Sequence, residues 1–466
     1  MRPKVALVSG FAFLAAGCAS VPHEPPAAPA SAERQLLVTG VRIVDPDSGT
    51  VSPPQDILIS GDRIATVAPA GAVSVVAGTP QLDGAGRFAM PGLIDVHAHV
   101  GEGGIGPQDD ATRARALRQF LRYGVTTIFV PGATGAGDAD FGSLRERCRA
   151  TAGSCPGLYG TGSILTAVGS HPVSTIFRMP DDVTDEVTEA RGVTLLRPGR
   201  DVDALIAAKK AAGADAIKII AEDGPPPWYP KPRLTDAQIR AVVTAADRQG
   251  LPVFAHISTA AQVRIALEAG VDGIMHAPTD RLPDDLIHAM AERRMWYVPT
   301  FALYDGILTW ARRQRESDPY ALKGVEPSAI ESLAAPQFLA AAAEDEAGAT
   351  AYLNNALDNL RRAAAAGVPI ALGSDVNNPF VYPGYSAHEE LAWMANVGMT
   401  PAQALRAGTV GSAAFLGASG RLGRIAEGYE ADLVLLARNP LERAENSRSI
   451  VAVVADGHRV ENVVSD

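Results

Sequence analysis

Aromatic residues, cysteines and basic clusters are scarce in this 466-residue sequence. Phe, Trp and Tyr make up only 6% of the chain, while hydrophobic residues make up 47%, so mainly Ala, Val, Leu and Ile must fill the core. Acidic residues outnumber basic ones, and the formal net charge is −11. An acidic chain without basic clusters binds nucleic acid poorly. We therefore expect no DNA or RNA partner.

Apolar runs long enough to span a membrane are also lacking. The N-terminus has a short apolar stretch (5–16) behind two basic residues, then small residues before Cys18 and a Pro/Ala-rich run. This pattern resembles a bacterial lipoprotein signal, in which the cysteine becomes lipidated. The resemblance implies a signal peptide (1–17), a flexible tether (18–35) and a lipid anchor on Cys18 at the periplasmic face of a bacterial membrane, the outer one rather than the inner. A simply cleaved export signal is the alternative.

Cys148 and Cys155 are the only other cysteines. An exported protein resides where disulfides persist. Six residues separate the two, enough for a small closed loop, so a disulfide and two unpaired thiols both fit. Neither cysteine lies in a metal-ligand pattern.

Both ends of the chain beyond the tether read as short strands. Segments rich in Val, Ile and Leu, separated by Gly and Asp turns, fill residues 36–90, and segments of similar composition occur over 425–466. Because these ends flank a long α/β middle, we expect them to pair into one small β-sandwich.

The middle of the chain (91–424) alternates short apolar segments with helical runs. Expected helices include 111–123, 202–212 and 236–249, and the pairs Thr235-Asp236 and Thr400-Pro401 read as helix starts. The expected strands cover 92–96, 125–130, 157–162, 216–221, 252–256, 273–276, 296–300 and 369–374. Eight strands alternating with helices predict an α/β fold of the (β/α)8 TIM barrel type.

Residues able to bind metal stand at the carboxyl ends of these strands, where barrel enzymes keep their chemistry. They are His97, His99, His256, His276 and Asp375, with Lys218 inside the fourth strand. Alternation along a strand places His97 and His99 on one face. Taken singly, each residue has a plain structural interpretation, such as a core histidine or a helix cap. Their shared position indicates a metal site.

Lys218 lies within an apolar strand, where a charged ammonium is costly. A neutral lysine can react with carbon dioxide to give an anionic carbamate, whose two oxygens can bridge two cations. The alternative is a lysine that reaches a buried carboxylate.

Six motifs resemble those of the amidohydrolase superfamily, in particular its prolidase-like and imidazolonepropionase-like binuclear metal hydrolases. They are PGLIDVHAHV (91–100), ADAIKII (214–220), FAHIS (254–258), IMHAP (274–278), ALGSD (371–375) and a C-terminal run over 400–436. The resemblance covers 36–466. It implies two divalent metal ions, usually Zn²⁺, with His97, His99 and Asp375 on the more buried ion, His256 and His276 on the other, and carboxylated Lys218 as the bridge. Ring deaminases with one metal lack this lysine, so the resemblance favours hydrolysis.

Asp375 and His171 are the expected catalytic residues. Two cations that share a water lower its pKa to about 7, and Asp375 would take the proton and pass it to the leaving nitrogen. The resemblance implies that His171 contacts substrate; an ordinary loop residue is the alternative. Many prolidase-like members have a tyrosine shortly after the fifth-strand histidine, whereas this chain has Ile257, Ser258 and Thr259, so prolidase specificity does not follow.

Several other residues have weaker interpretations. Trp228, Tyr229, Phe301 and Tyr304 either line an apolar pocket or pack under loops, and the long segment 301–350 is expected to cover the active site. His288 and His388 lie on polar helices and are expected at the surface.

The expected function is that of an exported metal-dependent amidohydrolase that cleaves amide- or peptide-type C–N bonds of small molecules. One alternative is a deaminase or cyclic amide or imide hydrolase of the same superfamily. Another is a non-catalytic metal-binding lipoprotein. The expected partner is a small amide or peptide substrate, membrane contact would come only through Cys18, and an oligomer is compatible with the sequence.

Overall fold

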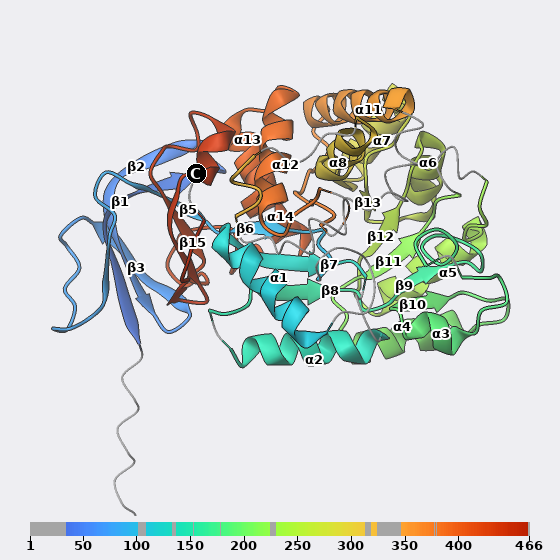
Figure 1. Cartoon of the computed structure of the whole chain (residues 1–466), viewed down its shortest axis with the longest axis horizontal. Coiled ribbons are helices and arrows are strands. Elements are labelled where there is room, and N and C mark those ends of the chain that lie inside the picture. Colours follow the sequence, from blue (N-terminus) through green and yellow to red (C-terminus); the bar gives the residue numbers. More distant parts are fainter. Residues whose placement is uncertain are drawn as a thin grey trace, which may run out of the picture. The chain divides into compact units, whose positions relative to one another are not determined.

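The two ends of the chain meet in one sheet. The computed structural model describes residues 34–100, 109–132, 137–151, 153–177, 179–223, 230–312, 318–323, 346–376, 378 and 380–464. The N-terminal strands are β1 (Gln35–Asp45), β2 (Thr50–Ser60), β3 (Arg63–Pro69), β4 (Gln81–Asp83) and β5 (Phe88–Pro91), and the C-terminal ones are β15 (Leu433–Leu436), β16 (Ile450–Ala455) and β17 (His458–Arg459). Their order is β17-β16-β15-β5-β1-β2-β3, with β4 on β1. Figure 1 shows the N-terminal strands in blue beside the C-terminal strands in red.

The pairing of the two ends occurs at β5. This strand runs parallel to β1 on one side and antiparallel to β15 on the other, with Pro91 opposite Leu433. The two ends therefore pair with each other, and β5 links both halves into one hydrogen-bonded sheet of eight strands. The β-sandwich stays a prediction. Buried aliphatic residues such as Ile57, Ile59 and Leu435 form a core of their own on this sheet.

Parallel strands form the α/β part of the chain. One sheet contains β6 (Leu93–Asp95), β7 (Val125–Val130) and β8 (Gly157–Gly160). The other has the order β10-β9-β11-β12-β13-β14, with β9 (Ile164–Thr166), β10 (Val193–Leu195), β11 (Ile217–Ile220), β12 (Val253–His256), β13 (Gly273–Met275) and β14 (Trp296–Val298). The α/β class is confirmed. Strands β9 and β10 were not predicted.

The predicted eighth strand (369–374) is only partly formed. In place of a ladder, Ile370 forms an isolated parallel bridge with Tyr297, and Val376, beyond the end of the segment, forms another with Ala98. The Val96 amide donates to the Leu372 carbonyl at 2.8 Å, so this segment touches both sheets. A closed eight-stranded barrel stays a prediction.

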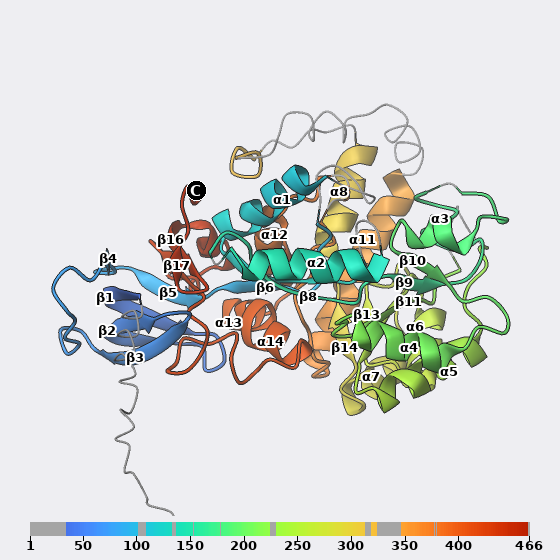
Figure 2. The same cartoon turned by 90° about the horizontal axis from the view of Figure 1, so that it is seen from below.

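Helices follow the strands along the chain. They are α1 (Asp110–Arg122), α2 (Gly137–Arg149), α3 (Asp185–Glu189), α4 (Val202–Ala211), α5 (Asp236–Arg248), α6 (Ala260–Ala269), α7 (Asp284–Glu292), α8 (Phe301–Ala311), α11 (Glu346–Ala365), α12 (Tyr385–Asn396), α13 (Pro401–Arg406) and α14 (Ser412–Phe415). Thr235 and Thr400 are N-caps with complete capping boxes, as predicted. Helices α8 and α11 pack against each other (Figure 2).

Two further features bear on the predictions. Cys148 and Cys155 form a disulfide, with Cα atoms 5.4 Å apart, which is an ordinary spacing for this bond. Among the described residues, no helix combines the length and apolar character needed to cross a bilayer. Cys18 and the predicted signal and tether lie outside the described residues, apart from their last two positions.

Candidate metal centre

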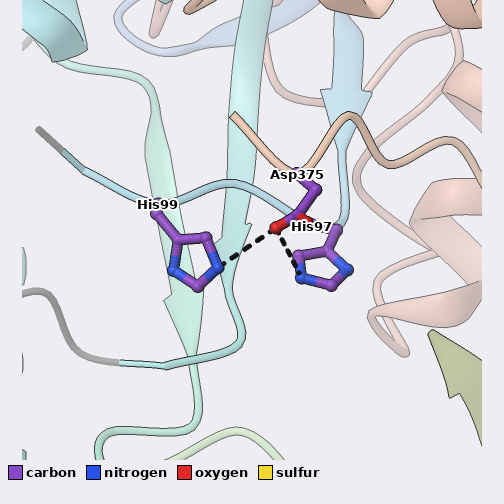
Figure 3. Close-up of side chains that lie close together, drawn as sticks. All are labelled: His97, His99 and Asp375. Atoms are coloured by element: carbon purple, nitrogen blue, oxygen red, sulfur yellow. Dashed lines mark ion pairs between the residues drawn. The ribbon is translucent and has the colours of Figure 1, made fainter. Parts of the chain in front are cut away.

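Three of the predicted ligands converge where β6 ends. His97 and His99 follow this strand, and Asp375 follows the partly formed eighth strand. Figure 3 shows one carboxylate oxygen of Asp375 between the two rings: Oδ1 lies 3.2 Å from Nε2 of His97 and 3.3 Å from Nε2 of His99. All three side chains are buried.

These distances fit a shared cation. Ligand atoms bonded to tetrahedral zinc at about 2.1 Å lie about 3.4 Å from one another. The carboxylate oxygen is close to this distance from both imidazole nitrogens, and all three atoms lie within 4.8 Å of one another. Two imidazoles and a carboxylate are also a donor set that zinc uses in proteins.

The protonation states suit metal binding, which needs neutral imidazole and ionised carboxylate. Burial lowers the pKa of His97 to about 3, and the Lys218 amine nearby acts in the same direction. Burial alone would raise the pKa of Asp375, but His97, His99 and His276 hold it well below its usual range. The carboxylate is therefore ionised at neutral pH.

A second group of ligand-type residues forms around Glu222, directly beyond β11. Its Oε2 lies 3.2 Å from Nε2 of His256, and its Oε1 lies 3.6 Å from Nδ1 of His171. Burial alone would raise the pKa of Glu222, but His256, His171 and Ser258 hold it well below its usual range. The sequence analysis missed Glu222; its position four residues after Lys218, on the same strand face, was the available signal.

His276 lies between the two groups. Its ring centroid is 4.7 Å from that of His97 and 4.1 Å from that of His256. Its Nδ1 lies 3.0 Å from Oγ1 of Thr300 and 3.8 Å from Oδ2 of Asp375. Thr300 thus orients the ring through Nδ1, and the ring lies within reach of both groups.

Lys218 is buried on β11, at 2% exposure, as predicted. Its Nζ donates to Sδ of Met275 at 2.8 Å. Burial lowers the pKa of Lys218 to about 7, against the opposing effect of Asp375 and Glu222. A large share of the amine is therefore uncharged at neutral pH, which is the form that reacts with carbon dioxide. Carboxylation itself stays a prediction.

Comparison with known proteins identifies the family. The model of the amidohydrolase family matches residues 88–460, most of the chain. The chain belongs to the amidohydrolase family. The prediction of a hydrolase acting on C–N bonds is confirmed, which sets aside the non-catalytic alternative.

Individual relatives show how far the likeness extends. Ochratoxinase from Aspergillus niger is 27% identical over 386 residues, 76% of this chain and 71% of that protein. Imidazolonepropionase from Vibrio vulnificus is 26% identical over 417 residues, 86% of this chain and 91% of that protein. A solved Xaa-Pro dipeptidase shares the fold, with a TM-score of 0.71 at 23% identity over 91% of this chain and 99% of that one.

Asp95 connects the two chain segments that carry ligands of the candidate metal centre. Its Oδ1 accepts from the backbone amides of His97 and Ser374 at 3.0 and 3.1 Å, and its Oδ2 accepts from the Ser374 hydroxyl at 2.5 Å. One buried carboxylate thereby joins the segment that carries His97 to the one that carries Asp375. Gly373 allows the same close approach, because a Cβ there would stand 2.6 Å from that of His97.

Other predicted residues have mixed outcomes. Phe301 and Tyr304 are buried, and the Tyr304 hydroxyl donates to the Ala277 carbonyl at 2.6 Å. His288 is exposed, as predicted. The surface assignment of His388 was wrong: the ring is fully buried, with Nδ1 2.8 Å from the Ser447 hydroxyl and Nε2 2.8 Å from a backbone carbonyl, because the C-terminal segment covers this side of α12. Trp228, Tyr229 and most of 313–345 lie outside the described residues.

Proposed function

We propose that this amidohydrolase cleaves amide- or peptide-type C–N bonds of small molecules, using two divalent cations, expected to be Zn²⁺, on a closed (β/α)8 barrel. The first cation would be bound by His97, His99 and Asp375, and the second by His256 and His276, with carboxylated Lys218 as the bridge. The observation that carries the proposal is the Asp375 carboxylate, whose Oδ1 lies 3.2 and 3.3 Å from two imidazole nitrogens.

Asp375 is suited to move a proton. Bound divalent cations lower the pKa of a water molecule and polarise a carbonyl. While Oδ1 faces His97 and His99, Oδ2 is directed towards His276 at 3.8 Å. Oδ2 can therefore take a proton from the attacking water and deliver it to the leaving nitrogen.

A panel of N-acyl amino acids, Xaa–Xaa dipeptides and cyclic amides, assayed with and without chelator, tests this function. We expect cleavage that chelator abolishes and Zn²⁺ restores. Asp375→Asn should lower kcat by about 10²- to 10⁴-fold, whereas Asp285→Asn, an exposed carboxylate on α7, should leave it unchanged. An Asp375→Asn variant that binds both cations and stays fully active would refute the role of Asp375. Ammonia release from a heterocycle panel without amide cleavage would identify a deaminase instead.

We also propose that the chain is exported and anchored by a lipid on Cys18. The lipoprotein-like N-terminus supports this proposal. Labelling with a fatty acid in a bacterial host should mark the full chain and place it in the membrane fraction. Cys18→Ser should lose both the label and the membrane association; retention of both would refute the anchor.

A further inference from the structure

Glu222 is buried beside an expected ligand of the second cation, yet the expected ligand set gives it no role. The residue is only 4% exposed. Its Oε2 lies 3.2 Å from Nε2 of His256 and accepts a hydrogen bond from the Ser258 hydroxyl, while its Oε1 lies 3.6 Å from Nδ1 of His171. Burying a carboxylate is costly unless donors surround its oxygens. The contact with His256 therefore helps to accommodate the buried carboxylate.

This contact also decides which nitrogen of His256 carries the hydrogen. An ionised carboxylate only accepts hydrogen bonds, whereas a neutral imidazole donates through one nitrogen and has a lone pair on the other. His256 should thus carry its hydrogen on Nε2, towards Glu222, and its lone pair on Nδ1. In metal sites the ring nitrogen that does not bind the ion commonly donates to a carboxylate or carbonyl, which fixes the tautomer and the ring orientation.

Neighbouring contacts hold the carboxylate and the ring in place. The Ser258 hydroxyl bonds the carboxylate, and the His171 ring stacks on that of His256 with centroids 4.7 Å apart. The other expected ligand of this ion, His276, has a similar arrangement, because its Nδ1 lies 3.0 Å from the Thr300 hydroxyl and leaves Nε2 for a metal. The rings of His256 and His276 are 4.1 Å apart, so both can reach one ion.

We propose that Glu222 is a positioning residue, which orients His256 so that Nδ1 of this ring binds the second cation. This inference rests on the proposed metal-dependent function and leaves its ligand set unchanged. Glu222 acts through His256 and touches neither the ion nor the substrate.

Zinc titration of the full chain tests the proposal. Calorimetry on chelator-treated protein should show two binding events for the wild type and for Glu268→Gln, which changes an exposed carboxylate on α6. Glu222→Leu, which removes the acceptor, should weaken the second event by about 10- to 100-fold. It should leave the first event unchanged, which also shows that the variant is folded. Glu222→Gln, which keeps an acceptor oxygen, should lose much less. A second event as tight in Glu222→Leu as in the wild type, or as weak in Glu222→Gln as in Glu222→Leu, would overturn the proposal.

The tautomer of His256 gives a readout that needs no metal. In ¹⁵N NMR spectra of the metal-free chain at neutral pH, the His256 signals are those missing from His256→Asn. We expect the hydrogen on Nε2 in the wild type and a mixture of both tautomers in Glu222→Leu. A wild-type hydrogen on Nδ1 overturns the positioning role even if two cations bind. A wild type with the expected tautomer that binds fewer than two ions overturns the two-cation function and, with it, the role of Glu222 towards the ion.

Discussion

Lys218 offers the sharpest test of the electrostatics of the site. Its amine is buried on β11, and burial lowers the pKa from its ordinary 10.5 to about 7. An amine whose pKa is lower in the folded chain than in the unfolded one destabilises the fold wherever it must carry a proton. Lys218→Met removes the amine and fills a similar volume, so the metal-free variant should be more stable than the metal-free wild type.

The size of this effect follows from the shift. One pKa unit corresponds to 1.36 kcal/mol, so a shift from 10.5 to about 7 is worth about 5 kcal/mol. Between these two values the unfolded chain binds more protons than the folded one, so the free energy of unfolding of the wild type rises with pH in this window. The advantage of Lys218→Met should thus be largest at pH 7 and below, and should disappear near pH 10.5.

Denaturant unfolding of metal-free protein, followed by tryptophan fluorescence from pH 7 to 10 in buffers free of carbon dioxide, measures this difference. Lys210→Met, at an exposed position on α4, serves as the matched control and should parallel the wild type at every pH. Wild-type and Lys218→Met curves that run parallel from pH 7 to 10 would refute the reasoning. With metal and ¹³C-bicarbonate present, the wild type alone should gain a carbamate signal in the carbon NMR spectrum.

Three other predictions concern two buried carboxyl groups and the disulfide. Asp95→Ala removes the link between the two ligand segments and should weaken Zn²⁺ binding by about 10- to 100-fold in calorimetry, while Asp95→Asn, which keeps an oxygen for the backbone amides, should lose much less. Burial raises the pKa of Glu390 well above its usual 4.5, so the wild type loses stability as pH rises above 4.5; Glu390→Gln should be more stable at pH 8 and equal at pH 4 in thermal melts. Replacing Cys148 and Cys155 by Ser opens an eight-residue loop and should lower the free energy of unfolding by about 2–3 kcal/mol, an effect that reductant reproduces in the wild type but not in the variant.

Local patterns in the sequence were enough to find most of the strands. Segments such as 125–130 combine β-branched residues with clear turn signals at both ends, and β7 has these bounds. The three-residue strands β9 and β10 have no such length or periodicity, so only their pairing with each other and with β11 defines them. The eighth strand is only partly formed: its apolar residues are present, but its backbone pairs with its neighbours through isolated bridges and a few hydrogen bonds.

The residues of the candidate site also differ in how well local sequence patterns predict them. His97, His99 and Asp375 could be found because strand ends converge in an α/β fold. Glu222 was missed despite its spacing from Lys218, because it precedes an Asp-Gly pair that reads as a plain turn, and its contacts with His171 and His256 come from other segments. His388 was misjudged for the same reason, since residues distant in sequence bury it.

Backbone conformation marks the site independently of ligand chemistry. His276, Thr300 and Asp375 adopt φ values of 76, 54 and 58°, a region that costs a residue with a side chain about 1–3 kcal/mol. Glycine or asparagine would relieve this cost, yet the positions hold a histidine, a β-branched residue and an aspartate. Tertiary bonds hold the strained turns: the Asp375 amide donates to the His97 carbonyl at 2.7 Å, and Thr300 bonds the His276 ring. The strained residues lie where the strands end, and their backbone conformation directs their side chains towards one centre. Their chemistry, and not local stability, therefore explains why these residues occupy these positions.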